Sequence, residues 1–254
     1  MILAIIQERM GSTRLPNKVM KYLVDKTVLE HVVARVNKSQ YINEIFVATT
    51  IDKNNLPLIQ ICSSRNIRIF CGSEEDVLDR YYQLAKLICP DHIVRITSDC
   101  PVIDPEIIDL IIQKHIKSNC DYTSNTLEAS YPDGLDTEVF SFSALQKAWQ
   151  EANLLSEREH VTPYIKNHPE IFSHNSILSK INYANKRWTL DTTQDFEFLK
   201  SIYENLYYTN NFFGMNDILY LINNQPSLEK INANIIRNEG YFKSVEKDKT
   251  FNKI

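Results

Sequence analysis

Short apolar runs alternate with amphipathic stretches through the first 125 residues, and this alternation limits the possible folds more than any other feature. The first run, Ile2–Ile6, is apolar at every position, which is typical of a strand buried on both faces of a sheet. A chain of 254 residues can fill one such core with a small lobe beside it. The order of elements predicts an α/β fold with a doubly wound, mainly parallel sheet. We expect strands at 2–6, 45–49, 67–70 and 93–97, and helices at 27–37, 56–64, 73–88 and from 104 onward.

Local signals indicate where several helices begin. The segments Thr27–Glu30 and Ser156–Glu159 match the capping-box pattern, in which the first and fourth side chains bond to each other's backbone amides. Ser73 is a candidate cap for the helix at 73–88. Asp104 precedes Pro105, and proline is favoured at the first helical position.

The pattern changes at about residue 131. We expect strands at 135–140 and 187–190, and helices at 141–152, at 192–208 and over most of the chain to about 237. These elements predict a single domain over residues 1–240, with a lobe at about 130–175. Residues 241–254 are predicted to be a charged C-terminal tail, loose from Lys243 onward.

Charge and cysteine content exclude several classes of protein. The formal net charge of −4 lacks the basic excess that sequence-independent nucleic-acid binding needs. No apolar stretch reaches the length of a membrane span, and the first residues do not match a signal peptide. The five cysteines are scattered and form no C-x-x-C pair, so neither a zinc site nor a disulfide is predicted. We expect a cytoplasmic protein that binds neither nucleic acid nor membrane.

The loop after the first predicted strand carries three cations in ten residues, Arg9, Arg14 and Lys18. Parallel sheets bind ligands beyond the carboxyl ends of their strands. Gly11 allows a close backbone approach, and arginine and lysine suit phosphate groups. The loop is not a P-loop, because the spacing after Gly11 is one residue too long and the second glycine and the Ser/Thr are missing. Polyphosphate binding and a solvated basic turn remain the two interpretations.

Two aspartates follow predicted strand ends, Asp99 after the strand at 93–97 and Asp191 after the strand at 187–190. A single aspartate at such a place often caps a turn. Two of them can hold Mg²⁺, which prefers oxygen ligands, provided that the sheet brings both strand ends together. Asp104 and Asp195 are better placed to cap the helices that follow.

Five motifs of this chain resemble those of the sugar cytidylyltransferases, a family that includes the acylneuraminate and 3-deoxy-manno-octulosonate cytidylyltransferases. They are RMGSTRLPNK (9–18), GSEEDVLDRYY (72–82), RITSDCPVID (95–104), YPDGLDTEVF (131–140) and EREHVTPY (157–164), and the segment RWTLDTTQDF (187–196) is similar as well. The spore coat polysaccharide biosynthesis branch is the nearest match. Asn17 replaces the usual glycine of the first motif, and asparagine tolerates positive φ better than most residues.

The resemblance implies a nucleotide-diphospho-sugar transferase fold, similar to the GT-A fold, and the Mg²⁺-dependent transfer of CMP from CTP to a sugar. The lobe at 130–175 would then serve the acceptor and dimerisation, and we expect a homodimer. The acceptor suggested by the family is an acidic nonulosonic sugar. In this chemistry the metal and cations neutralise charge at the α-phosphate, and no protein nucleophile is needed.

The resemblance also implies roles for individual residues. The catalytic residues would be Arg14, Lys18, Asp99 and Asp191, of which Asp99 and Asp191 would hold the metal. CTP would contact Arg9, Gly11, Ser12, Arg14, Lys18, Gly72, Ser73, Asp76 and Thr97. The acceptor would contact Asp136, Glu138, Arg158, His160 and Arg187, with Arg158 and His160 holding its carboxylate. Arg80 is interpreted as an intrahelical partner of Asp76.

Three other functions stay open at this point. The chain could be a nucleotidyltransferase of the same fold with another NTP or a non-acidic acceptor. It could be a GT-A-like glycosyltransferase, although no two aspartates stand two positions apart as a D-x-D metal motif requires. It could be a non-catalytic relative, although Lys18, Asp99 and Asp191 argue against that. The sequence does not identify the sugar.

Overall fold

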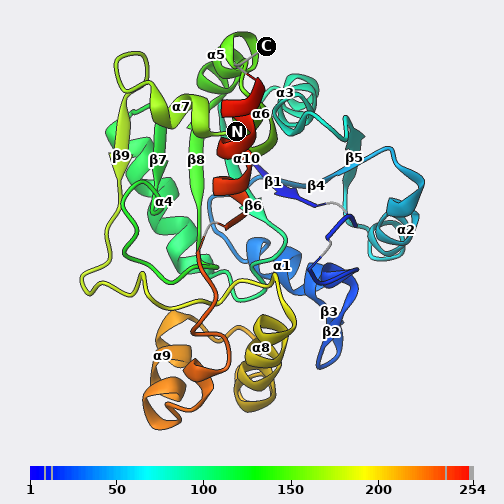
Figure 1. Ribbon diagram of the computed structural model, residues 1–254, viewed down its shortest axis with the longest axis vertical. Helices are drawn as coiled ribbons and strands as arrows, with labels where there is room; N and C mark the ends of the chain where they lie inside the picture. Colours follow the sequence, from blue (N-terminus) through cyan, green and yellow to red (C-terminus); the bar gives the residue numbers. More distant parts are fainter. Residues whose placement is uncertain (9, 13, 238, 252–254) are drawn as a thin grey trace.

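A single mixed sheet organises the chain (Figure 1). The computed structural model describes residues 1–8, 10–12, 14–237 and 239–251. Within these residues the main sheet has seven strands in the order β5-β4-β1-β6-β8-β7-β9. Only β8 runs against its neighbours there, so the predicted α/β fold with a mainly parallel sheet is confirmed. The strands are β1 (Ile2–Gln7), β4 (Glu44–Thr50), β5 (Ile69–Gly72), β6 (His92–Thr97), β7 (Tyr122–Ser124), β8 (Glu138–Ser141) and β9 (His174–Ser176).

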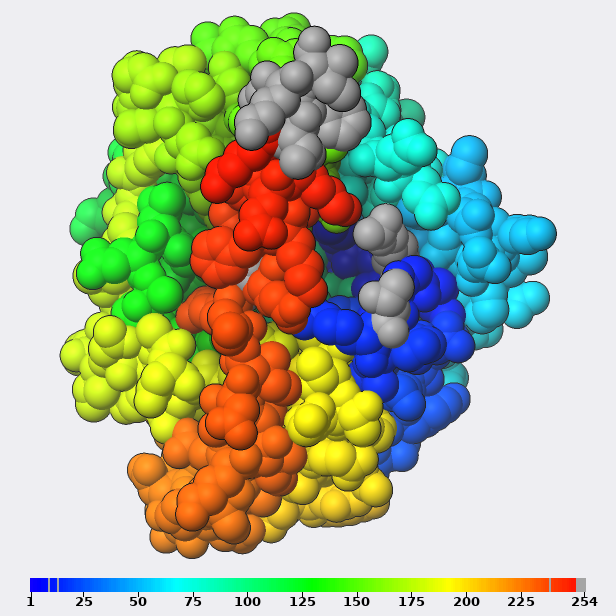
Figure 2. Space-filling model, in the orientation of Figure 1, coloured from blue at the N-terminus to red at the C-terminus, as the bar shows by residue number. Residues whose placement is uncertain are grey.

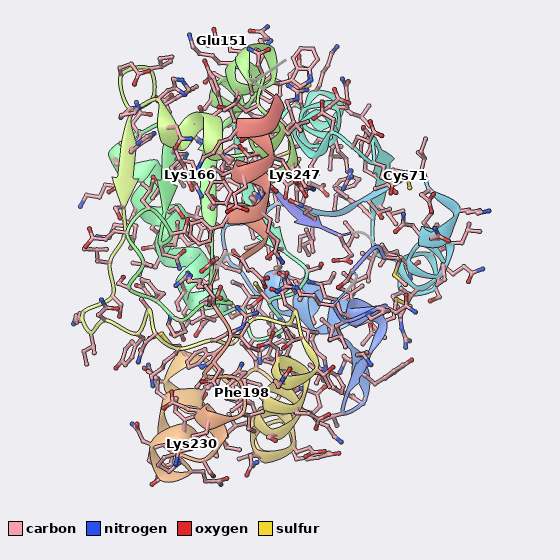
Figure 3. All side chains as sticks on the ribbon, in the orientation of Figure 1. Cys71, Glu151, Lys166, Phe198, Lys230 and Lys247 are labelled. Atoms are coloured by element: carbon pink, nitrogen blue, oxygen red, sulfur yellow. The ribbon has the colours of Figure 1, made fainter. Side chains whose placement is uncertain are left out.

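Helices cover both faces of this sheet and form two hydrophobic clusters. Strand β1 contributes to both, because successive side chains point to opposite faces: Ala4 and Ile6 enter one cluster, Leu3 and Ile5 the other. The first cluster contains side chains of α1 (Val28–Val36), α2 (Leu56–Ser64), α4 (Pro105–Ser118), α8 (Thr193–Leu206) and α9 (Met215–Asn224). The second contains side chains of α3 (Val77–Ile88), α5 (Phe142–Glu151) and α7 (Pro163–Asn167). Figure 3 labels Phe198, the α8 side chain that is buried in the first cluster.

Short elements complete the chain. Strands β2 (Tyr22–Leu23) and β3 (Lys26–Thr27) form a hairpin before α1. The turns η1 (Lys18–Met20), η2 (Lys53–Asn55) and η3 (Leu228–Lys230) are 3₁₀ helices. Helices α6 (Leu155–His160) and α10 (Glu239–Phe251) pack together. None of the helices in the described part of the chain has the length and apolarity that spanning a membrane requires.

Two of the predicted helix starts are confirmed. Thr27 Oγ1 accepts a bond from the Glu30 amide while the Glu30 carboxylate accepts one from the Thr27 amide, so the first capping box is complete. Asp104 caps α4 by accepting from the amide of Glu106.

Two other predicted caps are wrong. Asp76, not Ser73, caps α3, and Ser73 Oγ instead accepts a bond from the Asp76 amide. The box at Ser156–Glu159 does not form, because α6 begins two residues earlier than predicted and Glu157 closes its first turn. The Ser156 amide bonds instead to Asp248 of α10.

The predicted strand at 187–190 is also wrong, since Arg187 forms only an isolated bridge to Asp133. The residues before and after both Arg187 and Asp133 lie in loops, so the bridge does not extend into a ladder. The strand predicted at 135–140 begins only at Glu138, because residues 132–135 make a turn. Gly134 has φ +108 in this turn, and a Cβ there would lie 2.6 Å from the backbone of Trp188. The glycine therefore allows two loops to pack backbone to backbone.

The C-terminal segment differs most from its prediction. Instead of a loose tail, residues 239–251 form the helix α10, which crosses the face of the molecule shown in Figure 2. Ser244 and Asp248 are buried against α6, and both make hydrogen bonds to it. These contacts are polar, which explains why a hydrophobic pattern did not reveal them. The division of the chain into a domain, a lobe and a tail stays a prediction.

Candidate functional site

The site lies beyond the carboxyl ends of β1 and β6. The Lys18 ammonium donates to Asp99 Oδ2 and to Asp191 Oδ1, each at 2.9 Å. Two bonds hold the carboxylate-bearing segments together: the Leu190 amide donates to the Asp99 carbonyl at 2.8 Å, and the Thr189 hydroxyl donates to the same oxygen. The two aspartates therefore meet although no ladder joins their segments.

This cluster is only partly accessible, with exposed side-chain fractions of 11% for Lys18, 23% for Asp99 and 24% for Asp191. Burial alone would lower the pKa of Lys18, but the two aspartates raise it well above its usual value. Burial would likewise raise the pKa of Asp99, but Lys18 lowers it to about 2. Lys18 and Asp99 are therefore both charged at neutral pH.

The loop after β1 presents Arg14 to the same aspartate. Its guanidinium lies 3.3 Å from Asp191 Oδ2 and donates to Glu239 of α10 at 2.7 Å. Asn17 holds the turn before Lys18 with φ 56, in the left-handed region that the sequence suggested it would tolerate. Arg9, predicted to contact CTP, lies outside the described residues.

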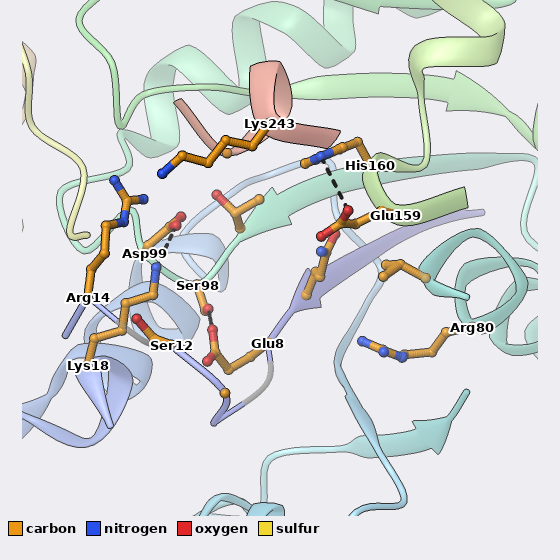
Figure 4. Close-up of a pocket in the computed structure, with 15 residues that line it drawn as sticks. Glu8, Ser12, Arg14, Lys18, Arg80, Ser98, Asp99, Glu159, His160 and Lys243 are labelled. Atoms are coloured by element: carbon orange, nitrogen blue, oxygen red, sulfur yellow. Dashed lines mark hydrogen bonds and ion pairs between the residues drawn. The ribbon is translucent and has the colours of Figure 1, made fainter. Parts of the chain in front are cut away.

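A cavity of about 370 Å³ opens over this cluster (Figure 4). Five of the predicted CTP residues line it together with Asp99: Gly11, Ser12, Arg14, Lys18 and Thr97. We call it the nucleotide cavity. Several other lining residues were not predicted, among them Glu8 and Ser98, which contact each other, and Gly240 and Lys243 of α10.

A second cavity of about 480 Å³ adjoins the first, and Arg14, Thr97, Asp99, His160 and Gly240 line both. We call it the acceptor cavity. Of the residues predicted to bind the acceptor, Asp136, Glu138, His160 and Arg187 line it. Asp191 lies on its wall as well, and so do Asp133, Lys166 and Arg237, which the sequence did not single out.

Charged pairs connect this cavity to the cluster around Lys18. Arg187 is buried and contacts Asp133, Asp191 and Asp195 at 2.9–3.2 Å. Asp195 also closes the capping box of α8 with Thr192, the structural role predicted for it. Burial and the neighbouring Asp136 raise the pKa of Asp133 to about 7.

The carboxylate of Glu138 is enclosed by charged and polar partners rather than left open to a ligand. It is buried, pairs with Arg95 and Lys166, and accepts hydrogen bonds from Tyr122 and Thr162. Burial would raise its pKa, but Lys166 and Arg95 lower it below its usual range. Glu138 therefore fixes Lys166 and Arg95 at the cavity wall.

The segment Gly72–Asp76 does not line the nucleotide cavity. A Cβ on Gly72 would meet the Arg80 side chain at 2.9 Å, so this glycine makes room for Arg80. Arg80 donates to the Ser73 carbonyl, whereas Asp76 pairs with Arg158. Arg158 also donates to the Trp149 carbonyl and lies outside both cavity linings.

His160 lies between the two cavities with its Nε2 3.0 Å from the Ser244 hydroxyl. Burial lowers its pKa to about 4. Its ring is therefore neutral at pH 7, and it can exchange hydrogen bonds there but cannot supply a positive charge.

Comparison with known proteins places this site in context. The cytidylyltransferase family profile matches residues 3–229. The spore coat polysaccharide biosynthesis protein SpsF of Bacillus subtilis is 37% identical over 210 residues, which cover 80% of this chain and 86% of that protein. A 3-deoxy-manno-octulosonate cytidylyltransferase of Geobacter metallireducens is 32% identical over 108 residues, 42% of each chain. A solved cytidylyltransferase from Leptospira borgpetersenii superposes with a TM-score of 0.86 at 31% identity, covering 92% of this chain and 98% of its own.

Proposed function

The chain belongs to the cytidylyltransferase family and is a CTP-dependent nucleotidyltransferase, and from that premise we propose that it transfers CMP from CTP to an acidic nonulosonic sugar. Pyrophosphate is the second product, and the nucleotide sugar serves the synthesis of a surface polysaccharide or glycan. A glycosyltransferase that consumes a nucleotide sugar is not what the family profile describes.

One observation carries the proposal: Asp99, Asp191, Lys18 and Arg14 converge where the two cavities meet. Transfer of CMP requires the α-phosphorus of CTP to lie between the nucleotide and the acceptor. Negative charge grows on the phosphoryl oxygens during attack, so cations belong at that point. Lys18 and Arg14 are the cations there.

The carboxylates also fit Mg²⁺. The described residues contain no group of three or more acidic, histidine or cysteine side chains that could enclose a metal. Mg²⁺ does not need one, because it is commonly bound by one or two carboxylates with substrate phosphates and water. Asp99 and Asp191 supply two charged oxygen ligands and now share the cation Lys18. When bound, Mg²⁺ supplies further neutralisation of the phosphate charge.

The sugar is proposed to lie in the acceptor cavity. Its attacking hydroxyl forms the new bond to the α-phosphorus while the bond to the β-phosphate oxygen breaks and pyrophosphate leaves. The hydroxyl proton needs an acceptor, and Asp136 is a carboxylate of this cavity whose pKa burial raises, which strengthens it as a base.

The carboxylate of an acidic sugar would be held by Lys166 and Arg237 rather than by Arg158 and His160. Both cations line the acceptor cavity. Arg158 lies outside this cavity, and His160 is uncharged, whereas Lys166 and Arg237 lie in it and are paired there with Glu138 and Asp136. The 3-deoxy-manno-octulosonate cytidylyltransferase among the relatives supports an acidic acceptor.

The proposal includes a cytoplasmic homodimer. The five free cysteines agree with a reducing compartment. Light scattering on the purified chain tests the dimer, and a monomer at micromolar concentration would contradict it.

The function is tested by pyrophosphate release from each of four NTPs against a panel of acidic sugars, neutral sugars and sugar phosphates, in Mg²⁺ and in EDTA. We expect release only with CTP, Mg²⁺ and an acidic sugar. Equal turnover with another NTP would overturn the base assignment, and a neutral sugar phosphate as best substrate would overturn the acidic acceptor.

A further inference from the structure

Helix α10 lies over the site although it falls beyond residue 229, where the family match ends. Gly240 lines both cavities, Lys243 lines the nucleotide cavity and Glu239 the acceptor cavity. The helix is fixed at its middle, where the Ser244 hydroxyl donates to Glu159. Its first turn is therefore positioned to contribute side chains to the reaction.

Glu239 at the start of α10 lies between two cations. Its carboxylate accepts from Arg14 at 2.7 Å and also pairs with Lys243, one helical turn further on. Arg14 and Lys243 both line the nucleotide cavity, and Figure 4 shows the Lys243 side chain extending along it toward Arg14. Lys243 and Arg14 lower the pKa of Glu239, so its carboxylate is an anion at neutral pH.

We propose that Arg14 and Lys243 bind the β- and γ-phosphates of CTP, and that Glu239 occupies this two-cation site until the nucleotide displaces it. The inference rests on the proposed reaction with CTP. It adds Lys243 as a nucleotide-binding residue and assigns Glu239 as an internal competitor of the triphosphate.

The exposure of these three side chains explains why the displacement of Glu239 by the phosphates of CTP is favourable. The exposed side-chain fractions are 36% for Arg14, 38% for Glu239 and 63% for Lys243. Ion pairs exposed to this extent contribute little to stability. Phosphate oxygens carry more charge and offer more acceptors than one carboxylate, so they form stronger bonds with the same two cations.

The geometry also indicates which phosphates are bound. The reacting α-phosphate belongs beside Lys18 and Asp99, where the two cavities meet. Arg14 reaches both Asp191 at this point and Glu239 of α10. A chain of phosphates that continues from Lys18 past Arg14 therefore arrives at Lys243.

The test is calorimetric titration of the full chain with CTP, CMP and inorganic pyrophosphate in Mg²⁺. Lys243→Ala is compared with Lys249→Ala, which removes the same charge from an exposed position of the same helix. Glu239→Gln is compared with Glu246→Gln, also exposed on α10. Melting curves establish that each variant folds.

We expect Lys243→Ala to weaken CTP and pyrophosphate about tenfold and to leave CMP unchanged, because CMP lacks the outer phosphates. Glu239→Gln should tighten CTP about threefold, since it removes a weak competing ion pair. General loosening of the helix cannot weaken CTP binding in one variant and tighten it in the other, since the two residues lie one turn apart. Both control variants should match the wild type.

Three results would overturn the proposal. Lys243→Ala could bind CTP as tightly as the wild type, or lose CMP affinity to the same extent as CTP affinity. Glu239→Gln could bind CTP more weakly than the wild type, which would make Glu239 a structural anchor. If the wild type binds CTP and only the variants fail these tests, the proposed function stands; a wild type that binds neither CTP nor pyrophosphate would refute both.

Discussion

Replacement of Lys18 by methionine is expected to destabilise the protein in a way that Mg²⁺ reverses. Lys18→Met keeps the volume of the side chain and removes the charge that Asp99 and Asp191 share. Two carboxylates, each about three-quarters buried, then face one another with no cation between them, although Asp191 keeps its contacts with Arg14 and Arg187. Like charges at such short range raise the free energy of the folded state.

The size of the effect follows from burial. Removing one partner of a buried ion pair costs about 3–5 kcal/mol. The partial exposure of both aspartates favours the lower end, about 3 kcal/mol. For a protein of this size each kcal/mol lowers the melting temperature by about 2–4 °C, so we expect a loss of about 6–12 °C in EDTA.

Thermal melts followed by circular dichroism at pH 7 measure this directly. Added Mg²⁺ should raise the melting temperature of Lys18→Met more than that of the wild type, because the freed carboxylates are available to the metal. The double variant Lys18→Met/Asp191→Asn removes the repulsion and should melt above Lys18→Met in EDTA. A Lys18→Met protein that melts within about 2 °C of the wild type, or that gains no more from Mg²⁺, would refute this reasoning.

The wild-type pair also predicts how stability depends on pH. The pKa of Asp99 is depressed to about 2, so its contribution is present above the unfolded pKa of about 3.9. It is lost as the pH falls from there toward 2. The Lys18 pKa is raised, so its contribution is present below its unfolded pKa and is lost as the pH rises above that value. Lys18→Met should flatten the acid side of the stability curve.

The remaining predictions concern the chemistry, the acceptor and the fold. Asp99→Asn and Asp191→Asn should each lower kcat by at least about 100-fold with the fold intact, and a near-normal rate at saturating Mg²⁺ would remove that residue from the metal site. Arg158→Ala should cost about 1–2 kcal/mol of stability by leaving Asp76 unpaired, while the KM for the sugar stays at its wild-type value; a raised KM would return Arg158 to the acceptor site. Gly134→Ala should destabilise the protein by about 3 kcal/mol in denaturant melts, through positive φ and a clash with neighbouring backbone, and a neutral result would contradict the close loop packing.

The sequence revealed the elements that bury continuous apolar side chains. Strands β1, β4 and β6 were predicted within about one residue at each end, because their short apolar runs leave a clear pattern. Asp99 and Asp191 were expected to meet only if the sheet joined two strand ends; they do meet at Lys18, but through the hydrogen bonds of Leu190 and Thr189 to the Asp99 carbonyl.

Polar contacts between segments that are far apart in the sequence leave no pattern comparable to an apolar run. Helix α10 docks through Ser244 and Asp248, two side chains that hydropathy places in solvent. The pairing of Asp76 with Arg158 joins two separate motifs, each of which was predicted to offer its charge to a substrate. Which charged or polar groups pair with one another depends on the tertiary structure. Neither the docking of α10 nor the pairing of Asp76 with Arg158 could therefore be predicted from the sequence.

The wall shared by the two cavities has a kinetic consequence for the proposed reaction. In a nucleotide sugar, one phosphate joins the nucleoside, which occupies the nucleotide cavity, to the sugar, which occupies the acceptor cavity. The bound product therefore overlaps CTP and the free sugar at the same time. Product inhibition should then be competitive against each substrate, whereas pyrophosphate, which fills only the nucleotide side, should compete with CTP and leave the sugar's access unchanged. Turnover in the cell would follow the rate at which a later transferase consumes the nucleotide sugar.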